Sequence, residues 1–328
     1  MTDTWTWATV TQATPLRIKV DGDTSELDAT TDNLVGSLAV SDRVRVHLHA
    51  DGIIVTGIQG GGNRSNPNLL INSDFMVNQE GNTSGASVAA YAYFLDGWYN
   101  ASGYGYSAGN ITWADVGGVR TLTIGVAGST RYTREKVEAS NTPAGMYTLS
   151  WEGTAQGQVM YDGGTDPGYS AGPITVYLNG TATVIIGFRG TGDTLRNVKL
   201  EQGTVATPYQ PPLYGDNLRA CMRYFQMLAN GDDGSRFPGY YATSTSILFF
   251  IEFKGVMRAA PTIVVTTATN EYVIYRDGGS DTFGSAFVDA VSPSRVALKN
   301  TTDVSGASGM AGAVRVYSSG LITADARL

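Results

Sequence analysis

The segment ITVYLNGTATVIIGF (residues 174–188) decides the fold class of this chain. In both of its halves apolar side chains occupy every second position, and Asn179 and Gly180 mark a turn between them. A period of two places alternate side chains on opposite faces of a β-strand. The segment therefore predicts two half-buried strands joined by a turn.

The same alternation recurs through residues 68–206. The other positions that show it are Leu122, Ile124 and Val126, then Tyr147, Leu149 and Trp151, then Val198 and Leu200. With 41 glycines and only 16% charged residues, the composition also favours strands joined by tight turns. Residues 68–206 therefore predict a two-sheet sandwich, and at this length a jelly roll is favoured over an immunoglobulin-like topology.

Residues 1–58 predict a smaller β-domain. Leu16, Ile18 and Val20 alternate with basic residues, and Val44, Val46 and Leu48 do the same, with Asp-Gly turns nearby. About five short strands in such a length favour a small closed barrel, and we expect an OB-like one. Residues 59–67 combine glycines with polar residues and a proline, which is typical of a linker.

The last part of the chain predicts a second sandwich. Residues 207–212 are proline-rich and favour an extended linker, after which residues 213–328 form the C-terminal domain. One short helix is expected behind Asp216 as N-cap, since apolar residues there recur at helical spacing. Those residues are Leu218, Cys221, Met222, Phe225 and Leu228. Strands are expected at 247–253, 262–267, 285–289, 295–298 and 314–317.

Composition and charge narrow the classes of partner. The chain has 328 residues, with 22 Lys and Arg against 29 Asp and Glu, and its net charge of −7 disfavours nucleic acid and anionic membranes as partners. Its most apolar stretch, residues 247–253, is far shorter than the roughly 20 residues that cross a bilayer. The sequence starts without a basic or apolar leader, so we expect no signal peptide and folding in the cytoplasm. A single cysteine, Cys221, excludes an intrachain disulfide.

The sequence predicts neither a metal site, nor a cofactor, nor a catalytic constellation. His47 and His49 are the only histidines, which leaves too few ligands for a zinc site and no partner for a serine or cysteine nucleophile. Glycoside hydrolysis needs only two carboxylates, so a polysaccharide depolymerase stays open as an alternative. Many Asp residues lie in turn motifs, however, where the side chain serves the backbone.

Aromatic residues in glycine-rich segments are the best candidates for ligand contact. A planar ring stacks on the apolar face of a sugar, while neighbouring polar side chains bind its hydroxyls. Trp98 is expected in the core, because it follows an apolar step in the sequence. The carbohydrate-binding candidates are Tyr104, Tyr106, Trp113, Tyr161 and Tyr169.

Three stretches resemble tail-fibre and minor tail proteins of bacteriophages. They are residues 68–79, which begin Asn-Leu-Leu-Ile-Asn-Ser-Asp-Phe, the Asp-Gly-Trp element at 96–98, and residues 196–225. The first domain also resembles that of minor tail proteins from phages of actinobacteria, and the middle domain resembles a carbohydrate-binding jelly roll. Arg196 stands where such jelly rolls carry an acidic calcium ligand, so calcium at this position is not expected.

The resemblance implies a protein of the virion tail, commonly a homotrimer. Its N-terminal domain would dock on other tail or baseplate proteins, and its sandwiches would bind a glycan of the host surface. The function expected is therefore attachment to the bacterial host without enzymatic activity. A purely structural tail or baseplate component is the first alternative, and the depolymerase is the second.

Overall fold

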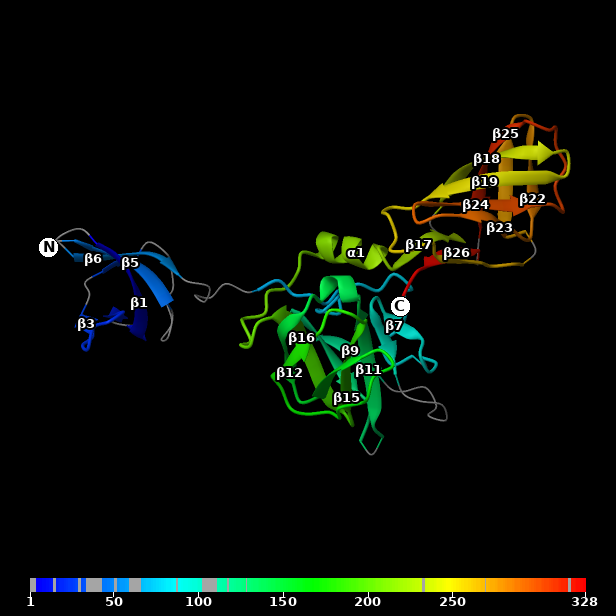
Figure 1. Cartoon of the computed structure of the whole chain (residues 1–328). Helices are drawn as coiled ribbons and strands as arrows, with labels where there is room; N and C mark the ends of the chain where they lie inside the picture. Colours follow the sequence, from blue (N-terminus) through cyan, green and yellow to red (C-terminus); the bar gives the residue numbers. More distant parts are fainter. Residues whose placement is uncertain are drawn as a thin grey trace. The chain divides into compact units, whose positions relative to one another are not determined.

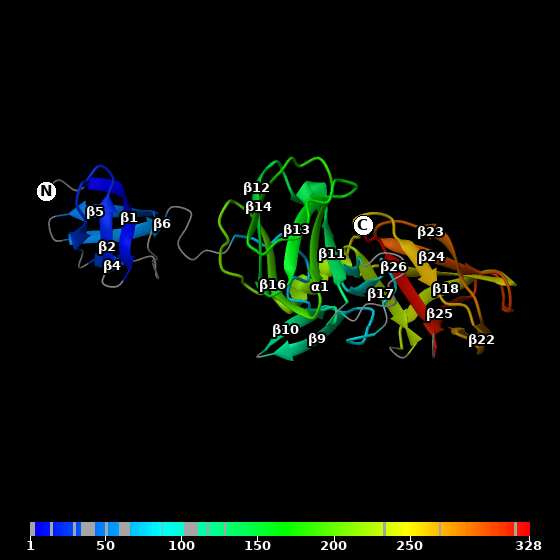
Figure 2. The same ribbon diagram turned by 90° about the horizontal axis from the view of Figure 1, so that it is seen from below.

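The computed structural model describes residues 4–13, 16–28, 31–33, 43–49, 52–58, 66–86, 88–101, 111–116, 118–127, 129–231, 234–268, 270–317 and 320–328. Apart from a single α-helix and short 3-10 turns, the regular elements in these ranges are β-strands, which confirms the all-β class. The chain divides into two compact units (Figure 1 and Figure 2). The units are residues 1–67 with 205–210, and residues 68–204 with 211–328.

The first unit is one sheet in the order β3-β2-β1-β5-β6-β4. Its strands are β1 (Thr4–Ala13), β2 (Leu16–Val20), β3 (Leu27–Asp28), β4 (Thr31–Asn33), β5 (Arg43–His49) and β6 (Gly52–Ile58). Ala8, Ile18 and Val44 are among its fully buried side chains, as the alternation predicts. A closed barrel was expected, but the short strands β3 and β4 each pair on one side only, so no ladder closes the sheet within the described residues.

The middle part of the chain is a sandwich of two five-stranded antiparallel sheets, ordered β14-β12-β16-β10-β9 and β13-β15-β11-β8-β7. From β11 onward, successive strands alternate between the two sheets, as in the expected jelly roll. The strands are β7 (Tyr93–Leu95), β8 (Trp98–Asn100), β9 (Ile111–Val116), β10 (Val119–Ile124), β11 (Arg131–Val137), β12 (Gly145–Gly153), β13 (Gln156–Tyr161), β14 (Ile174–Leu178), β15 (Val184–Gly190) and β16 (Asp193–Gln202).

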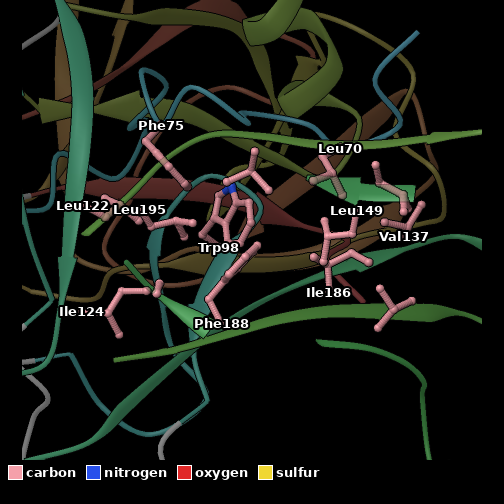
Figure 3. Close-up of a cluster of buried hydrophobic side chains, with 14 of the residues drawn as sticks. Leu70, Phe75, Trp98, Leu122, Ile124, Val137, Leu149, Ile186, Phe188 and Leu195 are labelled. Carbon is pink, nitrogen blue, oxygen red and sulfur yellow. The ribbon is translucent and has the colours of Figure 1, made fainter. Parts of the chain in front are cut away.

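Trp98 lies at the centre of this sandwich (Figure 3). Its ring is fully buried and meets Phe75 edge-on at 5.1 Å between centroids, and Phe188 on β15 of the same sheet at 6.1 Å. Its indole N–H donates to the carbonyl of Asn72 at 3.1 Å, so the one polar atom of the ring is satisfied inside the core. The prediction that Trp98 packs in the core is confirmed.

The C-terminal part is a second sandwich, in which a seven-stranded sheet and a three-stranded sheet share one core. The sheet orders are β22-β21-β25-β18-β19-β24-β23 and β17-β26-β20. The elements are α1 (Tyr214–Met222), β17 (Phe225–Asn230), β18 (Arg236–Thr243), β19 (Ser246–Glu252), β20 (Thr262–Val265), β21 (Tyr272–Arg276), β22 (Gly279–Phe283), β23 (Phe287–Val291), β24 (Arg295–Asn300), β25 (Ala311–Val316) and β26 (Leu321–Asp325).

The helix α1 is shorter than its apolar spacing predicts. Phe225 and Leu228 lie on β17, because the chain there pairs with β26 and gains its backbone hydrogen bonds from a sheet. The expected N-cap is also wrong: Leu213 occupies that position, and Asp216 lies in the first turn, where it pairs with Arg219. Cys221 is buried, as expected of a small core residue.

Asn217 on α1 joins the two sandwiches. Its side-chain oxygen accepts the backbone N–H of Asn72 at 2.8 Å, and its amide donates to Asp74 at 2.7 Å. All three residues are buried. The helix is thereby fixed to the opening segment of the middle sandwich.

A second junction is formed by Arg327 near the end of the chain. Its guanidinium binds Glu80 at 2.8 Å and Asp325 at 2.6 Å. It also lies over the rings of Tyr93 and Phe225, 4.0 and 4.5 Å from their centroids. Because Glu80 and Tyr93 belong to the middle sandwich, this arginine holds the two sandwiches together.

Candidate functional site

One face of the sheet β13-β15-β11-β8-β7 points away from the core and carries aromatic and basic side chains. Burial alternates along β11, so that Tyr132, Arg134 and Lys136 point outward. The antiparallel register places Arg189 of β15 opposite Tyr132, and Gln156 of β13 opposite Arg189. Tyr132, Arg189 and Gln156 thus form a row across three strands, called here the outer row.

The segment that follows β13 returns to this face and adds Tyr169, because an isolated antiparallel bridge ties it to the edge of β13. The Tyr169 ring lies 5.6 Å from the ring of Tyr132 and 5.3 Å from the guanidinium of Arg189. Arg134 donates to its hydroxyl at 3.4 Å. Burial raises the pKa of Tyr169, so its hydroxyl keeps its proton at neutral pH and can donate a hydrogen bond.

The side chain of Gln158 on β13 holds this arrangement in place by hydrogen bonds. In the amide orientation that gives both its oxygen and its nitrogen a hydrogen-bond partner, Gln158 donates to Asp166 at 2.7 Å and accepts from the hydroxyl of Tyr169 at 2.9 Å. It also accepts from Arg134 at 3.2 Å. The position of Tyr169 is therefore set by hydrogen bonds as well as by ring packing.

A groove of about 370 Å³ opens beside the outer row, lined by Thr130, Thr154, Gln156, Arg189, Gly190, Thr191 and Asp193. Arg189 donates through Nε to Gln156 at 2.8 Å, which orients both side chains along the groove. Hydrogen bonds from the Thr191 backbone and the Thr154 side chain lower the pKa of Asp193. The groove therefore presents a guanidinium, an amide, a carboxylate and hydroxyls within one small volume.

The two arginines of this face differ from the neighbouring lysine in their partners. Lys136 forms an ion pair with Asp162 at 2.8 Å. Among the described residues, no carboxylate lies within ion-pair distance of Arg134 or Arg189. Their charges are instead directed at the Tyr169 ring and hydroxyl, which leaves hydrogen-bonding capacity for a ligand.

The candidates named from the sequence fall in different places. Tyr169 belongs to the face described above, whereas Trp113 and Tyr161 pack against the core of the sandwich. Trp113 stacks on Phe94 at 6.2 Å, and the Tyr161 hydroxyl accepts the backbone N–H of Asn179 at 2.7 Å. Tyr104 and Tyr106 lie outside the described residues.

Sequence patterns did not single out Tyr132, Arg134 or Arg189. The signal available was the run of residues 131–136, in which basic, aromatic and hydroxyl side chains alternate with no apolar face. The backbone of Tyr132 is also tied to the end of β8, since the Ala101 N–H donates to the carbonyl of Tyr132 at 3.0 Å.

Other classes of site find no support in the described ranges. No group of three or more His, Cys, Asp and Glu side chains in them is placed to hold a metal ion. No described helix is long and apolar enough to cross a membrane. Comparisons with protein-family models, with curated proteins and with solved structures return no match for this chain.

Proposed function

We propose that this chain is an adhesion protein of a bacteriophage tail, whose middle sandwich binds a glycan of the bacterial surface without cleaving it. The resemblance of residues 68–79, 96–98 and 196–225 to tail-fibre and minor tail proteins supports the class of protein. The outer row, with Tyr169 and the adjoining groove, supports the class of ligand.

The observation that carries the proposal is the meeting of two tyrosine rings with a polar groove on one open sheet face. Tyr132 and Tyr169 are both partly exposed, and Arg189 contacts Tyr169 while lining the groove. Aromatic rings that stack on a sugar, next to fixed hydrogen-bond donors and acceptors, are the usual chemistry of glycan recognition.

The groove favours binding over hydrolysis. Glycosidases place two carboxylates about 5–10 Å apart across the scissile bond. Asp193 is the one carboxylate among the lining residues, and hydrogen bonds from Thr191 and Thr154 hold it. A depolymerase acting at this groove would need a second acid, which the lining does not supply.

The test is titration of the labelled full chain on an array of purified bacterial surface polysaccharides. We expect saturable binding to at least one of them and no release of reducing sugar. Tyr132→Ala should weaken that binding about fivefold or more, as the loss of a stacking ring typically does. Tyr177→Ala is the matched control, because Tyr177 is 60% exposed on β14 of the other sheet and should leave binding unchanged.

Equal effects of the two substitutions would refute the site, and the absence of any binding would favour a purely structural tail component. Release of reducing sugar would favour the depolymerase.

We also propose that the chain assembles as a homotrimer in the virion tail, with the N-terminal domain docking on other tail or baseplate proteins. Light scattering that gives a mass near the 34.7 kDa of one chain would contradict the trimer.

A further inference from the structure

The outer face of the seven-stranded C-terminal sheet brings two arginines together. Arg236 on β18 lies directly opposite Arg315 on β25. Side chains opposite each other in antiparallel strands have Cβ atoms about 4.5–5.5 Å apart, and like charges at such positions destabilise a sheet. An anion that bound both guanidinium groups would relieve this repulsion.

Two tyrosines frame the arginine pair. The guanidinium of Arg236 lies 5.4 Å from the centre of the Tyr275 ring, and that of Arg315 lies 4.4 Å from the centre of the Tyr317 ring. The hydroxyls of the two tyrosines are hydrogen-bonded to each other. That bond, and to a smaller extent the positive charge of Arg315, lower the pKa of Tyr317.

The protein itself supplies no counter-charge within the described residues. No carboxylate there lies within ion-pair distance of Arg236 or Arg315, whereas Arg276, on the same sheet, pairs with Asp281 at 3.4 Å. The Nε of Arg315 is buried and has no hydrogen-bond partner in the described part of the chain. The acid nearest in register is Glu271, which is buried just before β21. In a chain of net charge −7, two adjacent arginines that have no carboxylate partner in the described ranges are a candidate site for an anion.

An exposed strand row continues from the arginine pair. Arg236, Pro238 and Tyr240 alternate outward along β18, and the Tyr240 ring stacks with Phe250 at 6.4 Å. The four steps along the strand from Arg236 to Tyr240 span about 13 Å. The row thus offers a charged end and an apolar, aromatic end.

We infer that Arg236 and Arg315 bind a phosphate group of a phosphodiester-linked surface glycan, with the row toward Tyr240 contacting the adjoining sugar. A carboxylate has two oxygens in one plane with its carbon, which a single guanidinium fork already satisfies, whereas the two non-bridging oxygens of a phosphodiester diverge from a tetrahedral phosphorus and can each accept from a different arginine. The overall negative charge of the chain disfavours nucleic acid, whose binding needs many cationic contacts along the backbone. This site is distinct from the groove of the middle sandwich and does not depend on it.

The test compares binding of the full chain to three probes: a bacterial capsular polysaccharide with sugar-phosphate repeats, polygalacturonate, and single-stranded DNA. We expect binding to the phosphate polymer, weakened at least about tenfold in the double variant Arg236→Gln, Arg315→Gln. The matched control is Arg295→Gln, Lys299→Gln, which removes the same charge from β24 of the same sheet and should leave affinity unchanged. Thermal unfolding of each variant checks that the fold is intact.

Equal losses in the two double variants would overturn the site, because only net charge would then matter. Equal affinity for polygalacturonate would overturn the preference for phosphate, and equal affinity for DNA would overturn the glycan assignment. If folded Gln variants bind the phosphate polymer as the parent does, the arginine pair has no part in binding. None of these outcomes bears on Tyr132 or its groove.

Discussion

The junction made by Arg327 predicts a large loss of stability when this side chain is removed. Arg327→Ala deletes the ion pairs with Glu80 and Asp325 and the contacts with the rings of Tyr93 and Phe225. Breaking a buried pair costs about 3–5 kcal/mol, but the two carboxylates are 29% and 32% exposed and can regain water. Each cation–π contact adds roughly 0.5–2 kcal/mol. We therefore expect a loss of about 2–4 kcal/mol in the free energy of unfolding.

Differential scanning calorimetry of the full chain measures this loss. For a unit of this size, 1 kcal/mol lowers the midpoint of unfolding by about 2–4 °C, so the transition of residues 68–328 should fall by about 4–15 °C. Arg219→Ala is the matched control, since Arg219 pairs with Asp216 on an exposed surface of α1 and such pairs contribute roughly 0–1 kcal/mol. Midpoints of the two variants that agree within a degree would refute the role given to Arg327.

Two further predictions concern the middle sandwich. Burial raises the pKa of Glu135 well above its ordinary value of 4.5. The folded state therefore holds this proton more tightly than the unfolded state does, and the contribution of Glu135 to stability falls as pH rises above 4.5. Glu135→Gln keeps the acceptor for the Ile71 N–H and should remove this fall in stability with rising pH. The measurement is the midpoint of thermal unfolding at several pH values. Curves that run parallel for variant and parent would contradict the role given to Glu135. Gly153→Ala should cost about 2 kcal/mol or more in chemical denaturation, because φ is +116° and a Cβ would lie 2.2 Å from the Thr194 carbonyl oxygen. Gly163→Ala, where φ is positive but the space is open, should cost clearly less.

Alternation of apolar residues predicted the strands whose two faces differ most. The segments 174–178, 247–252 and 314–316 are strands with one apolar side in the core, whereas 184–188, predicted as half-buried, is a strand buried on both faces. The same rule failed where tertiary pairing outweighed local spacing. Phe225 and Leu228 continue a helical pattern, yet they pair in a sheet because β26, about a hundred residues later, supplies the partner strand.

The candidate site was harder to predict because β11 lacks an apolar face. Its buried side carries Arg131, Thr133 and Glu135, so the strand does not differ from a polar loop in its pattern. Glu135 is tolerated there because its carboxylate accepts the backbone N–H of Ile71 at 2.8 Å, a contact between distant segments. Aromatic content alone pointed equally to Tyr169, which lies on the open face, and to Trp113 and Tyr161, which pack on the core.

Hydrogen–deuterium exchange of the full chain, with and without the polysaccharide that binds it best on the array, tests directly whether this face binds a glycan. We expect bound glycan to slow exchange in β11, in the first residues of β13 and in the segment around Tyr169, which form the outer row and its groove. Strands β14 and β9 of the opposite sheet should exchange as before. Protection confined to other parts of the chain, or no protection with any polysaccharide, would contradict the claim that this face binds a surface glycan.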